Sequence, residues 1–161
     1  MPAPNSPAVS GPAISTCLWF DDQAEAAARF YCSLFDGAEI TEAVSVLIAI
    51  DQLGAEAICV APNIEQAHTI DHLAGKPTEE YRNVLTESAR IARGKIKDIA
   101  QVQERDLDAL IFPGGFGAAK NLSDFAFKGS DCDVNEHVAR LSRAMHAAKK
   151  PIGFACIAPV I

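Results

Sequence analysis

The chain has 161 residues, 49% of them hydrophobic and 22% charged, which is the size and composition of one soluble globular domain. Lys and Arg number 14 against 21 Asp and Glu, giving a net charge of -7, so the clustered cations that bind nucleic acid are lacking. No apolar run approaches the roughly 20 residues of a membrane span. Five cysteines without a C-x-x-C pair indicate free thiols in a reducing, cytoplasmic compartment. We therefore expect neither nucleic acid nor a membrane as a partner.

The N-terminal part differs in composition from the rest. The first thirteen residues, MPAPNSPAVSGPA, hold four prolines and no charge, and they have neither the basic start and apolar stretch of a secretory signal nor the arginines of a transit peptide. We expect a disordered arm at 1–13 and a single α/β domain at 14–161. That domain would begin with an apolar strand at 14–20 and a helix at 24–35.

Beyond residue 37, helical spacing alternates with short and almost continuously apolar strands. The expected strands are EAICVA at 56–61, IKDI at 96–99, DALIF at 108–112 and IGFACIA at 152–158, and the expected helices lie at 40–54, 79–93 and 133–149, with an irregular excursion at 63–78. Asp133 and Glu136 form a capping box for the last helix, whose Val138, Leu141 and Met145 share one face. Such alternation is typical of an α/β domain with a parallel sheet. Ligands of these sheets bind beyond the carboxyl ends of the strands.

The segment GFACIAP at 153–159 is the strongest candidate for a chemical site. A strand that ends in one Cys between small residues fits a tight strand-to-helix turn, in which the side chain projects above the sheet and the next backbone N–H faces a substrate. The N–H groups of a following helix and a nearby acid–base group would favour the thiolate of Cys156. The alternative is a small buried core residue, the commonest fate of a free Cys.

The segment PGGFG at 113–117 follows another apolar strand. Its glycines would let backbone N–H groups approach an anionic oxygen, as an oxyanion hole requires. A dinucleotide-binding loop is a weaker alternative, because the third glycine is missing and no helix obviously starts within the segment. A plain structural turn is the other alternative.

The remaining polar candidates have ordinary explanations. Glu42, on the helix expected at 40–54, would usually be a solvated surface charge. His68 and His72 have a spacing that zinc ligands use, but no third ligand is evident, so we expect no metal. His137 and His146 fit a solvated helix face.

These segments also resemble a known family. The resemblance runs from FDGAEITEAV at 35–44 through RNVL at 82–85 and is densest in PGGFGAAKNL at 113–122 and GFACIAP at 153–159. In these motifs the chain, over residues 35–161, is similar to the ElbB-like glyoxalases of the PfpI superfamily, whose fold is class I glutamine amidotransferase-like. The resemblance implies a flavodoxin-like parallel sheet with helices on both faces. Because family members continue some tens of residues beyond the cysteine, it also implies a fold incomplete at the C-terminus.

The activity that this resemblance implies is a glutathione-independent glyoxalase without a cofactor, which converts glyoxal or methylglyoxal into glycolate or lactate and is associated by family with isoprenoid biosynthesis. The family's nucleophile falls on Cys156, and the acidic partner of the wider superfamily falls on Glu42. Backbone amides at Gly114, Gly115 and Ile157 would form the oxyanion site. The partner would be a small dicarbonyl substrate. Apolar surface left uncovered at the C-terminal end would favour a homo-oligomer.

Residues 14–34, ISTCLWFDDQAEAAARFYCSL, resemble instead the first strand and helix of PhnB-like proteins of the vicinal oxygen chelate superfamily. A metal ligand could be expected on that strand in metal-using members, but Cys17 occupies its middle and the rest of that fold is absent, so no chelate-type metal site is assigned.

Two alternatives to a glyoxalase stay open. One is a non-catalytic regulatory or binding protein that kept the cysteine turn. The other, more distant, is a glutaminase-type amidotransferase, for which no His–Glu pair follows the nucleophile.

Overall fold

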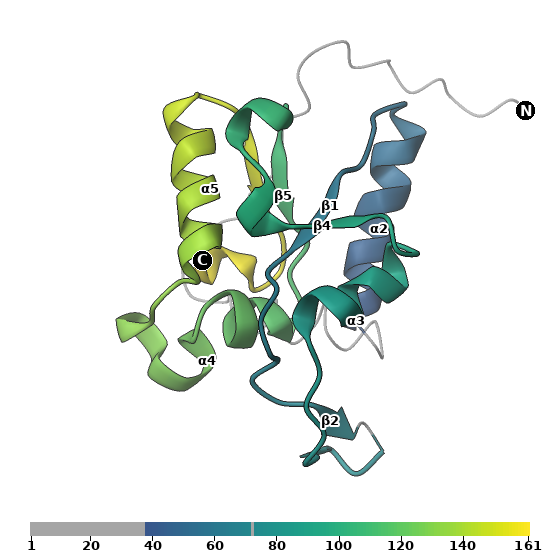
Figure 1. Ribbon diagram of the computed structural model, residues 1–161, viewed down its shortest axis with the longest axis vertical. Helices are drawn as coiled ribbons and strands as arrows, with labels where there is room; N and C mark the ends of the chain where they lie inside the picture. The colour runs from purple at the N-terminus through teal and green to yellow at the C-terminus, as the bar shows by residue number, and fades with distance from the viewer. Residues whose placement is uncertain (1–37, 72) are drawn as a thin grey trace, which may run out of the picture.

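The computed structural model describes residues 38–71 and 73–161 (Figure 1). The elements run in the order α2 (Ala38–Gln52), β1 (Cys59–Ala61), β2 (Ile70–Asp71), β3 (Lys76–Pro77), α3 (Val84–Ile91), β4 (Ile96–Asp98), β5 (Leu110–Phe112), α4 (Phe125–Lys128), α5 (Glu136–Ala147) and β6 (Ile152–Phe154). Short helical turns lie at Ile99–Gln101, Glu104–Asp106, Ala118–Leu122, Gly129–Asp131 and Ala158–Val160. The arm expected at 1–13, the strand at 14–20, the helix at 24–35 and the change of resemblance near residue 34 lie outside the described residues.

Two pairs of parallel strands form the centre of the described part. β1 pairs with β4, with Cys59 opposite Ile96, and β5 pairs with β6, with Leu110 opposite Ile152. In Figure 1, α5 lies on one side of the strands, and α2 and α3 lie on the other. Parallel strands with flanking helices confirm the predicted α/β fold of the flavodoxin-like type. Within the described residues, no helix is both long enough and apolar enough to cross a membrane.

The last helix, α5, contributes buried side chains to the hydrophobic core. Val138, Leu141 and Met145 are completely buried, which confirms the predicted apolar face, and each contributes about 1.5–3 kcal/mol by leaving water. The helix is also held by Arg140, whose guanidinium donates hydrogen bonds of 2.9 Å to the carbonyl oxygens of Ile99 and Val102. These bonds satisfy carbonyl groups of the helical turn that follows β4, and so they fix α5 against it.

The predicted cap of α5 was wrong. Asn135 caps the helix, because its side-chain oxygen accepts hydrogen bonds from the backbone N–H groups of His137 at 3.1 Å and Val138 at 3.3 Å. Asp133 instead lies in the preceding turn, where its carboxylate is 2.8 Å from Lys128 Nζ. Asp133 and Asn135 are two positions apart and both have side chains that can cap a helix, so the sequence alone does not show where α5 starts. The conformation of the backbone turn decides which of the two caps it.

The helix expected at 79–93 is shorter at its start. Asn83, with extended backbone angles, accepts a hydrogen bond from the backbone N–H of Thr86 and begins α3 at Val84. The residues before it, 79–82, are not helical. The excursion expected at 63–78 is irregular except for a short antiparallel pairing of β2 with β3.

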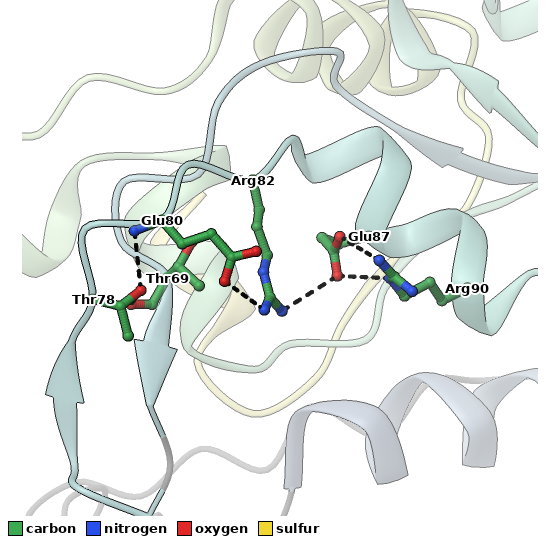
Figure 2. A network of polar contacts seen from close by, with 6 residues as sticks. All are labelled: Thr69, Thr78, Glu80, Arg82, Glu87 and Arg90. Carbon is green, nitrogen blue, oxygen red and sulfur yellow. Dashed lines mark hydrogen bonds and ion pairs between the residues drawn. The ribbon is translucent and has the colours of Figure 1, made fainter.

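Figure 2 shows how the hairpin strand joins α3 through a chain of polar contacts. Thr78 Oγ1 donates to the carbonyl oxygen of Thr69 at 3.3 Å. Arg82 lies between Glu80 at 2.8 Å and Glu87 at 3.8 Å, and Glu87 also pairs with Arg90 at 2.9 Å. Since most of these side chains are exposed, water and salt screen the pairs and each contributes little to stability. The chain of contacts orients the hairpin and is not a buried site.

Candidate active site

The turn after β6 holds Cys156 in a strained conformation. Cys156 has a φ of 55°, in the left-handed region that costs a residue with a side chain about 1–2 kcal/mol. The turn is fixed on one side by the backbone N–H of Ala155, which donates to the carbonyl oxygen of Phe112 at 3.0 Å, and on the other by Ala158, whose N–H donates to the carbonyl oxygen of Ala155 at 2.9 Å. Cys156 is exposed to solvent, so the alternative of a small buried core residue is wrong. Strain of this kind gathers at functional sites.

The register of β5 and β6 brings the glycine turn to this cysteine. Phe112 is the register partner of Phe154, so Gly114 and Cys156 each lie two residues beyond the paired strand ends. A Cβ atom added to Gly114 would lie 2.6 Å from the carbonyl oxygen of Ala155 and 2.9 Å from Cys156 Cβ. Gly114 also has a φ of 96°, which only glycine adopts without strain. The close approach of the two turns therefore requires a glycine at position 114.

Glu42 reaches the same point from helix α2. The Cβ atom added to Gly114 would lie 2.8 Å from Glu42 Oε2, so the carboxylate, the glycine turn and the cysteine turn converge. Oε2 is buried and has no hydrogen-bond partner among the described residues. A buried polar atom left unpaired costs about 1–3 kcal/mol. The interpretation of Glu42 as a solvated surface charge was wrong.

The surroundings raise the pKa of the Cys156 thiol. Partial desolvation of the sulfur, within a residue that is otherwise exposed, is the largest cause, and the Glu42 carboxylate beside it acts in the same direction by favouring the protonated thiol. The backbone N–H groups of Gly115 and Ile157 act in the opposite direction. The thiol of the resting protein is therefore protonated at neutral pH. This differs from the thiolate expected from sequence, because the carboxylate and the desolvation outweigh the two amides.

The structure thus brings together all five residues that the sequence singled out. The side chains of Cys156 and Glu42 face each other, the amides of Gly115 and Ile157 point at the sulfur, and Gly114 gives the space in which the two turns meet. Chemically, this arrangement offers a nucleophile, a carboxylate beside it and two backbone N–H donors directed at the sulfur.

The glycine turn continues directly into a helical turn, which the sequence did not suggest. Helical structure begins at Phe116 and continues through Ala118–Leu122. Phe116 is half exposed, and Lys120 Nζ lies 4.7 Å from the centroid of its ring. This aromatic and cationic pair directly follows Gly115 and was missed, because PGGFG was interpreted only for its glycines. Asn121 Oδ1 accepts a hydrogen bond of 2.8 Å from the backbone N–H of Ala67, which ties the excursion to this turn.

The histidines have no evident part in this site. The ring of His68 packs edge-on against Phe127 at 5.7 Å, and His72 lies outside the described residues. His137 Nε2 is 3.5 Å from a carboxylate oxygen of Glu136 on the surface of α5. Among residues 38–71 and 73–161, no group of three or more His, Cys, Asp or Glu side chains could hold a metal ion.

Known proteins are similar to different parts of the chain. Residues 12–90 match the family model described as 3-demethylubiquinone-9 3-methyltransferase, a match that includes the N-terminal segment outside the described residues and ends within α3.

The later part of the chain is similar to another group. The rat "ES1 protein homolog, mitochondrial" and the human "Glutamine amidotransferase-like class 1 domain-containing protein 3, mitochondrial" are each 56% identical over 131 residues, which make up 81% of this chain and 49% of the relative. The chain therefore spans about half the length of these curated relatives.

A solved structure supports the same relationship. The crystal structure of an isoprenoid biosynthesis protein with an amidotransferase-like domain from Ehrlichia chaffeensis superposes with a TM-score of 0.71 at 41% identity, covering 76% of this chain and 58% of that one. The parallel-strand fold and these similarities agree with each other. Over the part that these relatives match, the chain is similar to glutamine amidotransferase-like proteins and has an amidotransferase-like fold.

Proposed function

We propose that the protein is a cofactor-independent, ElbB-like glyoxalase that converts glyoxal or methylglyoxal into glycolate or lactate. The observation that carries this proposal is the buried, unpaired Oε2 of Glu42 next to the strained turn of Cys156. A carboxylate oxygen with no partner among the described residues is free to take a proton, and the neighbouring thiol is the nearest group that could give one. The substrate class is a small dicarbonyl, because the proposed chemistry needs two adjacent carbonyl carbons.

The first proposed step is attack of sulfur on the aldehyde carbon. The thiol of the resting protein is protonated, so Glu42 takes the thiol proton as the carbon–sulfur bond forms and passes it to the aldehyde oxygen, which completes a hemithioacetal and leaves Glu42 ionised again. The N–H groups of Gly115 and Ile157, which point at the sulfur, support the negative charge that develops on that oxygen during attack.

The second proposed step moves hydrogen between the two carbons. Glu42 removes the proton from the hemithioacetal carbon and gives it to the neighbouring carbon by way of an enediol, while the hydroxyl proton of the hemithioacetal moves to the former ketone oxygen. The former aldehyde carbon is thereby oxidised to a thioester, and the former ketone carbon is reduced to an alcohol. Water then cleaves the thioester, which releases the hydroxy acid and restores the Cys156 thiol. The oxidation and the reduction balance within one substrate, so no external oxidant or cofactor is needed.

The direct test is formation of lactate from methylglyoxal in the absence of glutathione. Cys156→Ala should abolish it and Glu42→Gln should lower it at least about a hundredfold, within the range of general acid–base catalysis. Cys132→Ala is the matched control, because Cys132 is a free and half-buried cysteine in another turn, and it should keep the wild-type rate. Equal rates in wild type and Cys156→Ala would remove Cys156 from the reaction and overturn the proposal.

A second candidate is a non-catalytic regulatory or binding protein of the same superfamily. The raised pKa of the Cys156 thiol favours it, because a thiol that stays protonated is a weak nucleophile. Saturable binding of a dicarbonyl without any acid product would support this candidate. Ammonia release from glutamine, lost in Cys156→Ala, would instead support a glutaminase, the third alternative.

The proposal also includes a metabolic association and a cellular compartment. A link with isoprenoid biosynthesis is supported by the description of the Ehrlichia chaffeensis protein. A reducing compartment suits a free nucleophilic thiol, and we propose the cytoplasm, although the names of the rat and human relatives say mitochondrial. Fractionation of cells that make the tagged protein distinguishes the two compartments.

A further inference from the structure

A lysine and a phenylalanine lie next to the glycine turn of the candidate site. Phe116 directly follows Gly115, whose backbone N–H is directed at the sulfur of Cys156. The Phe116 side chain is 50% exposed, and Lys120 Nζ lies 4.7 Å from the centroid of its ring. The residues that follow the glycine turn therefore place an ammonium group over an open aromatic face, one residue beyond an N–H donor of the site.

The backbone that carries Lys120 is fixed against the cysteine turn. Lys120 belongs to the helical turn Ala118–Leu122, which contacts the turn Ala158–Val160 that follows Cys156. The first residues of these two turns are buried in one hydrophobic cluster. The neighbouring Asn121 side chain also accepts a hydrogen bond of 2.8 Å from the backbone of another segment. Lys120 is thus on a rigid support and not on a mobile loop.

The charge of Lys120 is available to a bound molecule. Within the described part of the chain Lys120 forms no ion pair, whereas the nearby Lys128 is paired with both Asp124 at 2.6 Å and Asp133 at 2.8 Å. Lys120 is also not among the groups that shift the pKa of the Cys156 thiol. Its charge would therefore act on the part of a substrate that extends away from the sulfur.

We propose that Lys120 selects substrates that have an anionic group at the end away from the reacting aldehyde, and that Phe116 holds the ammonium group in place for this contact. The inference rests on the proposed function and narrows the substrate class from small dicarbonyls to anionic α-oxoaldehydes. An ammonium group over an aromatic face keeps its charge and its N–H donors, so it can donate to a carboxylate or phosphate oxygen. Proton transfer stays with Glu42.

Turnover of two matched substrates tests this selection. Dioxovalerate and propylglyoxal are α-oxoaldehydes of equal chain length, the first with a terminal carboxylate and the second with a terminal methyl group. Wild type should have the higher kcat/KM for dioxovalerate. Lys120→Met should reduce this preference about tenfold or more, mainly through KM, because the contact is made to a group that does not react. Equal preferences in wild type and Lys120→Met would overturn the proposal.

Two further variants separate the charge from other effects. Lys120→Arg keeps a cation that can lie over the ring and should keep most of the preference. Lys97→Met is the matched control, because Lys97 is an exposed lysine of β4 and its loss changes the net charge equally; it should keep the wild-type preference. Hydroxypyruvaldehyde phosphate then distinguishes the two anions, since a higher kcat/KM than for dioxovalerate identifies the anionic group as a phosphate.

Thiol alkylation gives a second readout, which does not depend on the glyoxalase reaction. Iodoacetate and iodoacetamide attack the same thiolate of Cys156, so its pKa cancels in the ratio of their rates. The rate with iodoacetate relative to iodoacetamide should be at least about twofold higher in wild type than in Lys120→Met, the effect of one unit charge roughly 8 Å away in water. The same ratio at Cys132 should not change and is the internal control.

The two readouts separate the failure of this inference from the failure of the proposed function. If wild type turns over neither α-oxoaldehyde, the proposed function fails, and the alkylation ratio at Cys156 still decides whether Lys120 attracts anions to the site. A ratio that is equal in wild type and Lys120→Met would overturn the selection of anions by Lys120, whatever the rate of turnover.

Discussion

Phe112 and Phe154 are register partners at the ends of β5 and β6, and their rings stack with centroids 5.2 Å apart and planes inclined by 12°. Because this pair ends both strands at the same height, the glycine turn and the cysteine turn leave the sheet side by side. The carbonyl oxygen of Phe112 then accepts the hydrogen bond from Ala155, which sets the position of Cys156. The stacked pair of Phe112 and Phe154 therefore positions the two turns that form the candidate site.

Shortening Phe112 should damage both stability and the site. Phe112 is 5% exposed, so Phe112→Ala should lower the free energy of unfolding by about 3–5 kcal/mol, measured by urea denaturation. Phe127→Ala is the control, because Phe127 is 54% exposed, and it should cost clearly less. An equal loss in both variants would contradict the supporting role of Phe112.

Gly114→Ala should remove activity beyond its effect on folding. The added Cβ would lie 2.6 Å from a backbone oxygen and 2.8 Å from Glu42 Oε2, so the two turns must separate. Gly54→Ala is the control, because Gly54 has a φ of 71° but open space around it, so an added Cβ there causes backbone strain without a clash. This variant should lower the free energy of unfolding by about 1–2 kcal/mol and leave the rate of lactate formation unchanged. Lactate formation by Gly114→Ala at the wild-type rate would show that the close approach is not needed.

The sequence predicted the location of the candidate site better than its chemistry. GFACIAP and PGGFG identified two strand ends, and a parallel sheet places such ends on one edge. The convergence of Glu42 with them came only from the family resemblance, because helical spacing alone makes Glu42 a surface charge. The protonation of Cys156 could not be predicted from sequence, since it depends on the burial of the sulfur and on its distance from a carboxylate on another element.

Glu42→Gln should separate thiol reactivity from turnover. The Glu42 carboxylate raises the pKa of the Cys156 thiol, so its removal should lower that pKa and speed alkylation by iodoacetamide at mildly alkaline pH. Lactate formation should fall in the same variant, because the group that moves the protons is gone. Alkylation of Cys132 in the same molecule is the internal control. Slower alkylation of Cys156 would contradict the assigned effect of the carboxylate.

The raised pKa of Cys156 also predicts how stability depends on pH. The folded thiol keeps a proton that the unfolded thiol loses near its usual pKa of about 8.5, so this contribution is fully present below that pH and is lost as the pH rises. Urea midpoints measured between about pH 8 and about pH 10 should fall more steeply in wild type than in Cys156→Ala. Parallel curves would show that the folded and unfolded thiols titrate alike.

Element ends were the least predictable part of the fold. The apolar face of α5 was evident from Val138, Leu141 and Met145, because burial follows helical spacing. The start of the same helix was not, since Asp133 and Asn135 both have capping side chains. Likewise, the apolar run at 56–61 forms a strand only over Cys59–Ala61, because pairing with β4 sets its length.

The cap of α5 can be tested by comparing these two residues. Asn135→Ala removes the acceptor of two backbone N–H groups and should lower the free energy of unfolding by about 1 kcal/mol, within the 0.5–2 kcal/mol typical of lost caps. Asp133→Ala removes only an ion pair with Lys128 between exposed side chains, so its effect should be smaller than that of the lost cap. Added salt distinguishes them further, because it screens the ion pair and leaves the cap unaffected. A larger, salt-independent loss in Asp133→Ala than in Asn135→Ala would restore Asp133 as the cap.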